Sequence, residues 1–126
     1  LWGMAADLQK EDWRGVAALL EAEQQSGDRI VLVDEDIHAP LNYAYQGGLP
    51  QQGVSRFEVD ETRLDGLVQG WADAGGRVWL VQSHHDTDAL ERAFVRSPRW
   101  ARELQADFLG VMVQRYRWTE PTGAGG

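Results

Sequence analysis

Two short apolar runs constrain the fold of this chain more than any other feature. Residues 30–33 and 78–81 are each purely apolar, each run follows an arginine, and each strand ends in a polar turn. Runs of this length without polar alternation are typical of strands that are buried on both faces, as in a parallel sheet. We therefore expect both runs to lie at the centre of one sheet, with helices from the rest of the chain covering it.

Helical periodicity surrounds these runs. Apolar residues at helical spacing predict helices over about 12–26, 60–74 and from residue 88, each beginning at an aspartate that can cap it. Pro40 suits the first turn of a short helix. We also expect a helix to restart at Ser97 and Pro98, with Trp100, Ala101 and Leu104 on its buried side.

Two further strands complete the expected sheet, a modest one over 54–58 and an edge strand over 108–118. Strands that alternate with helices predict a three-layer α/β/α sandwich around a mainly parallel sheet of four or five strands. This fold would be Rossmann-like without a glycine-rich nucleotide loop, because acidic residues follow the first strand. The sequence divides into a lead-in over 1–11, a single α/β domain over 12–118 and a tail over 119–126 whose composition predicts disorder.

Composition narrows the possible partners. Among 126 residues the net charge is −8, which disfavours a nucleic-acid partner because such binding relies on clustered positive charge. Lys10 is the only lysine and there is no cysteine, so lysine-dependent chemistry and thiolate metal sites are largely excluded. The apolar runs are far shorter than the ~20 residues of a membrane span, so the chain as given reads as soluble. Because it begins at Leu1 without a signal-peptide pattern, we expect it to be a piece of a longer chain.

Polar residues follow both central runs. Ligands of open α/β sheets usually bind at the carboxyl ends of the strands, and that rule brings the two polar turns to one edge. Two tyrosines on the short helix lie beside this edge. The candidate ligand or partner surface therefore comprises Asp34, Asp36, His38, Tyr43, Tyr45, Ser83, His84, His85 and Asp86.

Several chemistries are compatible with that surface. His84, His85 and Asp86 could bind a metal with the earlier aspartates, or pair with Asp34 as acid and base in a small hydrolase. Adjacent histidines seldom bind one ion, however, and a solvated turn that caps the next helix explains these residues as well. We therefore predict no metal, no cofactor and no catalytic residue in this chain. A sugar could stack on the tyrosines, whereas core packing explains Trp13, Trp71, Trp79 and Trp100 better.

A phospho-receiver is the nearest signalling alternative, because an acidic cluster ends the first strand. The second run instead ends in Gln82 and Ser83, where a receiver carries its phosphoacceptor aspartate, and the late lysine is missing. The alternative function is thus a free-standing α/β module that binds a ligand or takes part in signalling. Such a module would be a degenerate receiver, without the residues that receivers need for phosphotransfer.

Four segments carry a family resemblance. They are Asp-Trp-Arg-Gly-Val-Ala at 12–17, Gly-Asp-Arg-Ile-Val-Leu-Val at 27–33, Pro40 with Tyr43 and Tyr45, and Arg-Val-Trp-Leu-Val-Gln-Ser-His at 77–84. Together, over roughly 12–118, they resemble the soluble C-terminal domain of bacterial polytopic membrane glycosyltransferases of the GT-C class, akin to protein mannosyltransferases and aminoarabinose transferases.

The resemblance implies a domain on the extracytoplasmic face of the membrane, preceded by a bundle of membrane helices in the same chain. Such enzymes transfer a sugar from a polyprenyl-phosphate donor, and their catalytic acid lies in an early loop between membrane helices. No position of this sequence matches that loop, so no catalytic residue is carried over. The implied roles are to cover the membrane active site, to bind an acceptor or to support assembly. The implied partners are the transmembrane part of the parent chain and a carbohydrate or lipid-linked sugar.

Overall fold

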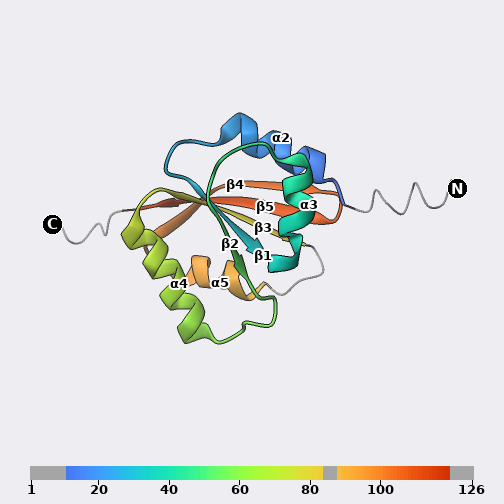
Figure 1. Ribbon diagram of the computed structural model, residues 1–126. Coiled ribbons are helices and arrows are strands. Elements are labelled where there is room, and N and C mark those ends of the chain that lie inside the picture. Colours follow the sequence, from blue (N-terminus) through green and yellow to red (C-terminus); the bar gives the residue numbers. More distant parts are fainter. Residues whose placement is uncertain (1–10, 84–87, 120–126) are drawn as a thin grey trace, which may run out of the picture.

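The computed structural model describes residues 11–83 and 88–119, in which helices cover both faces of one sheet (Figure 1). In chain order the elements are α2 (Trp13–Glu23), β1 (Arg29–Val33), η1 (Glu35–Ile37), α3 (His38–Ala44), β2 (Gln51–Val54), α4 (Glu61–Ala74), β3 (Arg77–Ser83), α5 (Ala89–Arg96), β4 (Trp100–Phe108) and β5 (Val111–Trp118). The two apolar runs form β1 and β3, which pair side by side in parallel as the sequence predicts.

The sheet is mixed, with the strand order β2-β1-β3-β5-β4. β1 pairs in parallel with β2 and β3, over four and five residue pairs. β5 pairs antiparallel with β3 and β4, over seven and eight residue pairs. The prediction of a mainly parallel, Rossmann-like sandwich is therefore wrong, because the C-terminal part of the observed sheet is a long antiparallel hairpin. The same hairpin sets the fold apart from the all-parallel sheet of a receiver.

The source of this error lies in β4, which was expected to be a helix. The register of β4 on β5 shifts between Arg102 and Leu104, so one extra residue bulges out of the strand. The bulge interrupts the in-out alternation by which a strand is recognised. As a result Trp100 packs on one face of the sheet and Leu104 on the other, at a spacing that imitates a helix.

The position of β5 also differs from the expectation. The predicted edge strand over 108–118 is divided by a two-residue turn at Leu109 and Gly110, where Gly110 has the positive φ of 74° that glycine tolerates best. β5 lies inside the sheet and β4 forms the edge. The strand expected over 54–58 lies slightly earlier, at Gln51–Val54.

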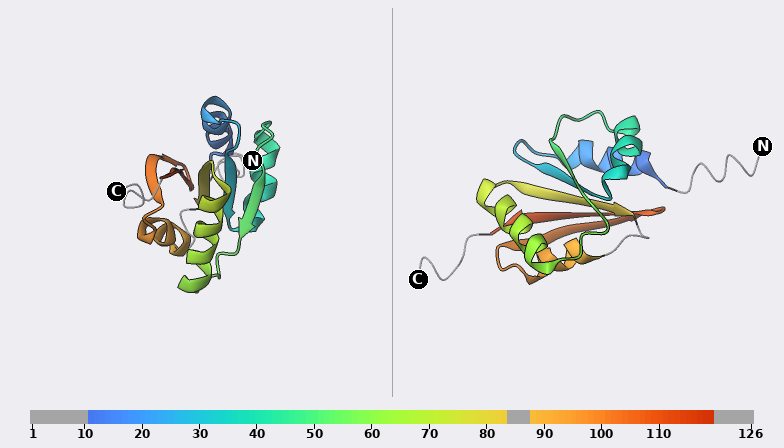
Figure 2. Two further views of the ribbon diagram at one scale, coloured as in Figure 1. Left: turned by 90° about the vertical axis from the view of Figure 1, so that its left-hand side faces the viewer. Right: turned by 60° about the horizontal axis from the view of Figure 1, so that its bottom comes forward.

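Helices lie on both faces of the sheet (Figure 2), and two hydrophobic clusters, one on each face, hold these layers together. α2 and α3 pack on the face that includes Trp79, whereas α4 and α5 pack on the opposite face around Phe94. The Phe94 ring stacks on Tyr116 at 4.2 Å between centroids and meets the edge of Trp100 at 5.4 Å. Among the described helices, none combines the length and apolar character needed to cross a membrane.

Candidate functional site

An open cleft of about 700 Å³ lies where the carboxyl ends of β1 and β3 meet the helices of one face. Three parts of the chain form it: the start of α2, the outer side of α3 and the turn between β4 and β5. Its walls are residues 11–14, Ala39, Pro40, Tyr43, Ala44 and Leu109. The cleft is thus at the end of the sheet where open α/β folds usually bind ligands.

The start of α2 is fixed against the β4–β5 turn by short backbone contacts. The Asp12 backbone N–H donates to the Leu109 carbonyl at 2.9 Å, and the Asp12 side chain caps the helix by accepting from the Gly15 N–H at 2.9 Å. A Cβ at Gly15 would lie 2.8 Å from the Phe108 ring, closer than real Cβ atoms come. The glycine therefore lets the start of the helix approach the hairpin closely.

The lining combines aromatic and charged groups. The Tyr43 side chain is 88% exposed, and the half-buried Trp13 indole donates to the Glu11 carboxylate at 3.2 Å. Arg14 is exposed, and neither its guanidinium nor the Tyr43 hydroxyl has a hydrogen bond or ion pair with any described residue. The cleft thus offers a bare ring and free donors to a ligand.

The second predicted tyrosine has a different role. Tyr45 is buried, and its hydroxyl donates to Gln24 Oε1 at 2.6 Å and accepts from the Leu49 N–H at 3.3 Å. Burial, together with the nearby Glu21 and Asp28 carboxylates, raises the pKa of Tyr45 despite the Leu49 hydrogen bond. This side chain ties α3 and the segment after it to the end of α2, and it does not reach the cleft.

The predicted aspartates and histidine near β1 remain at the same end of the sheet but outside the cleft lining. Asp34 forms an ion pair with Arg56 at 3.7 Å, and Asp36 is exposed. His38 is exposed at the start of α3, with its Nδ1 3.3 Å from the Asn42 amide nitrogen. They do not converge into one site.

The polar turn after β3 is described only in part. Ser83 ends β3 and pairs with Val111 of β5. His84, His85 and Asp86 lie outside the described residues. Within 11–83 and 88–119, no three His, Cys, Asp or Glu side chains are grouped so that they could hold a metal.

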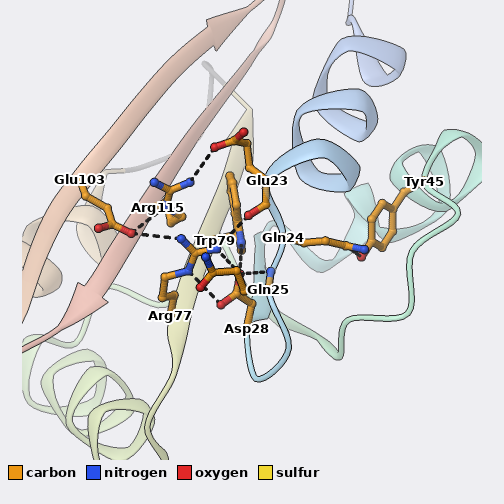
Figure 3. A network of polar contacts seen from close by, with 9 residues as sticks. All are labelled: Glu23, Gln24, Gln25, Asp28, Tyr45, Arg77, Trp79, Glu103 and Arg115. Carbon is orange, nitrogen blue, oxygen red and sulfur yellow. Dashed lines mark hydrogen bonds and ion pairs between the residues drawn. The ribbon is translucent and has the colours of Figure 1, made fainter.

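A polar network lies at the opposite end of the sheet (Figure 3). It includes residues from two of the segments that carry the family resemblance, 27–33 and 77–84. The buried Asp28 carboxylate accepts two hydrogen bonds from Arg77, at 2.8 and 3.0 Å, and one from the Trp79 indole at 2.9 Å. The Gln25 N–H adds another at 2.9 Å. Burial alone would raise the pKa of Asp28, but these hydrogen bonds and the Arg77 charge outweigh it and lower the pKa.

The same network continues across the hairpin. Arg77 also donates to the Glu23 carbonyl at 2.9 Å, and Glu103 accepts from Arg77 at 3.4 Å and from Arg115 at 2.8 Å. The Arg115 guanidinium lies 5.1 Å from the centre of the Trp79 ring. The network therefore joins α2, the turn before β1, β3, β4 and β5, and its role is structural.

A third set of polar groups lies on the α5 face, where it fixes the hairpin. Gln114, which is fully buried, donates to Glu91 at 3.0 Å and to Gln105 at 3.1 Å, and accepts from the Tyr116 hydroxyl at 2.7 Å. Burial, and next the Glu91 charge, raise the pKa of Tyr116 to about 12. The set is bonded within itself, so it specifies strand register rather than binding a ligand.

Of the cleft residues, sequence reasoning singled out only Tyr43. Glu11, Asp12, Arg14 and Leu109 were missed, and Trp13 was assigned to the core. The available signal was the resembling segment at 12–17, which combines a helix cap, an aromatic ring and an arginine with a glycine. No protein-family model matches this chain, and neither the search of curated proteins nor that of solved structures gave a match.

Proposed function

We propose that this chain is the noncatalytic domain of a polytopic membrane glycosyltransferase that uses a polyprenyl-phosphate sugar donor. In this proposal the domain lies on the extracytoplasmic face, and the carboxyl end of β1 and β3 faces the membrane-embedded part of the parent chain. The resembling segments motivate the assignment. The distribution of exposed apolar side chains is the observation that carries the orientation.

Large apolar side chains gather at that end of the described structure. Tyr43, Phe57, Val59 and Leu109 are 62–88% exposed, on α3, on the loop after β2 and on the β4–β5 turn. Val95, on α5, is the remaining large apolar side chain with such exposure among the described residues. Several large exposed apolar groups at one end of the domain favour a surface that meets a partner there.

The course of the chain supports the same orientation. Asp12 is hydrogen-bonded to the β4–β5 turn, so the described part of the chain begins at this end. Acidic side chains, including Asp34, Asp36 and Asp60, accompany the apolar ones. Because anionic lipid headgroups repel such charges, a protein surface suits this end better than the bilayer itself.

Thiol labelling of the parent enzyme in intact cells tests both location and orientation. The described domain has no cysteine, so Phe57→Cys and the matched Val95→Cys each introduce one thiol, provided that any native cysteines of the parent are replaced. We expect a membrane-impermeant maleimide to label Val95→Cys in intact cells and to label Phe57→Cys several-fold more slowly.

Two results would contradict the proposal. If neither thiol reacts until the cells are broken, the domain is not extracytoplasmic. If the two thiols react at the same rate although their exposure in the isolated domain is similar, the apolar end does not face the membrane part.

A free-standing ligand-binding module is the second function, and the open cleft is the observation that favours it. The domain of a membrane glycosyltransferase would follow membrane-spanning segments in the same reading frame, whereas a free-standing binding module would not.

A further inference from the structure

We infer that the cleft between α2, α3 and the β4–β5 turn binds a neutral carbohydrate, with the Tyr43 ring as its stacking platform. The inference deepens the proposed function, on which it rests for the source of the sugar: a neutral acceptor rather than the phosphate-linked donor. The chemistry of the cleft itself can be tested on the 126-residue chain alone.

The size of the cleft fits a small polar ligand. Its volume of about 700 Å³ lies within the range of ligand pockets, and the cleft is open to solvent, so that one ring can bind while a longer chain extends outward. Pro40 and Leu109 add apolar surface to the lining. A sugar presents apolar C–H groups on one ring face, which such a surface can cover.

The platform is well supported. Leu41, two residues before Tyr43, is fully buried, and Asn42 exchanges side-chain hydrogen bonds of 2.8 and 2.9 Å with Gln51 at the start of β2. These contacts hold α3 while leaving Tyr43 88% exposed. The backbone beneath the ring is thus held, and a tyrosine has only two side-chain torsions whose freedom is lost when a ligand stacks on it.

Polar groups around the ring match the edge of a sugar. The Arg14 guanidinium and the Tyr43 hydroxyl are free of described partners and can donate to ring hydroxyls. The Glu11 carboxylate accepts from the Trp13 indole through one oxygen, and its other oxygen can accept from a hydroxyl. The lining therefore supplies both donors and acceptors, as vicinal hydroxyls require.

Charge decides between a neutral sugar and a phosphorylated one. Two carboxylates, Glu11 and Asp12, line the cleft against one guanidinium, that of Arg14, so the lining is net negative. The N-terminus of α2 could otherwise attract an anion, but the Asp12 carboxylate already caps it. A phosphate would meet repulsion here, whereas a neutral sugar would not.

Titration monitored by NMR tests the inference. The probes are the methyl glycosides of glucose, mannose and galactose, with glucose 1-phosphate as the charged comparison. We expect at least one neutral glycoside to bind in the millimolar range and to shift the Trp13 indole signal, assigned with Trp13→Phe. The buried Trp100 indole, which donates to the Val68 carbonyl on the other face, should not move.

Matched variants locate the binding. A stacked ring that covers on the order of 60 Å² of sugar contributes about tenfold in affinity, so Tyr43→Ala should weaken binding by about that factor. Phe57→Ala removes a ring of comparable exposure outside the cleft and should change nothing. Both side chains are exposed, so neither variant should impair folding.

Three results would overturn the inference: no response to any neutral glycoside, equal loss in the two variants, or tighter binding of glucose 1-phosphate. None of these results bears on thiol labelling of the parent enzyme, so a failure of the carbohydrate site and a failure of the proposed function are distinguishable.

Discussion

Replacing Asp28 by alanine removes the acceptor at the centre of the network that joins the two halves of the sheet. The carboxylate is 2% exposed and accepts hydrogen bonds from Arg77, Trp79 and the Gln25 N–H. Alanine leaves the Trp79 indole N–H without its acceptor in a fully buried position. It also leaves the Arg77 charge, on a side chain only 15% exposed, without its main partner.

The magnitude follows from what is left behind. Removing one partner of a buried ion pair typically costs about 3–5 kcal/mol, most of it from the uncompensated charge. Arg77 keeps the Glu23 carbonyl at 2.9 Å and Glu103 at 3.4 Å, which favours the lower end of that range for the ion pair, and the stranded indole N–H adds to it. We expect Asp28→Ala to lower the free energy of unfolding by about 4 kcal/mol in total, which corresponds to a fall in Tm of about 10–20 °C.

Chemical denaturation measures this loss, and Asp65→Ala is the matched control. Asp65 pairs with Arg96 at 2.6 Å, closer than the 2.8 Å of Asp28 with Arg77, but both members of the Asp65–Arg96 pair are exposed. Solvent screens an exposed pair, so Asp65→Ala should leave the free energy of unfolding nearly unchanged. If the two variants lose equal stability, burial does not determine the strength of the Asp28 network and the reasoning is refuted.

The effect of Asp28 also depends on pH. Its pKa in the folded state lies below the value in the unfolded chain, so the folded state holds the charged form more strongly. The contribution of the Asp28 charge to stability is therefore complete above the pKa of aspartate in the unfolded chain, about 4. It is lost as the pH falls through the lower pKa that Asp28 has in the folded protein. The difference in unfolding free energy between the wild type and Asp28→Asn should be constant near neutral pH and shrink in acid.

Two further variants test the local packing, both by denaturation. Replacing glycine by alanine normally favours a helix by about 1 kcal/mol. In Gly15→Ala, however, the new Cβ meets the Asp12 capping carboxylate and the Phe108 ring, the latter at 2.8 Å, so we expect a net loss of about 1–2 kcal/mol in the free energy of unfolding. A gain in stability would show that both neighbours move aside easily. Tyr45→Phe removes the hydroxyl that bonds to Gln24 and Leu49 and should lower the free energy of unfolding by about 1 kcal/mol. Tyr43→Phe should leave the free energy of unfolding unchanged. Equal effects of the two variants would mean that Tyr45 does not belong to the core and Tyr43 to the cleft.

The centre of the sheet was predictable because its signal is local. The runs that became β1 and β3 are apolar on both faces, and Asp12 and Asp60 cap helices whose apolar faces repeat regularly. The C-terminal hairpin was not predictable in the same way. The β4 bulge at Arg102 to Leu104 disrupts alternation, and only pairing with β5, a tertiary contact, selects strand over helix.

The candidate site was predictable to the level of an edge rather than of its residues. Ligands of open α/β sheets usually bind at the carboxyl ends of the strands, and that rule points to the end of the sheet where Tyr43 lines the open cleft, although the sheet is mixed. Two tyrosines on one short helix look alike in sequence, yet Tyr45 turns inward to Gln24 while Tyr43 faces the cleft. The partners at Glu11 and Leu109 come from distant parts of the chain, which only the fold brings together.

The most direct test of the central claim is to read the parent gene upstream of the codon for Leu1. A domain of a polytopic glycosyltransferase predicts several upstream segments of about 20 consecutive apolar residues in the same frame. A reading frame that starts near Met4, with no apolar segment of that length before it, would contradict the claim and leave a free-standing binding module.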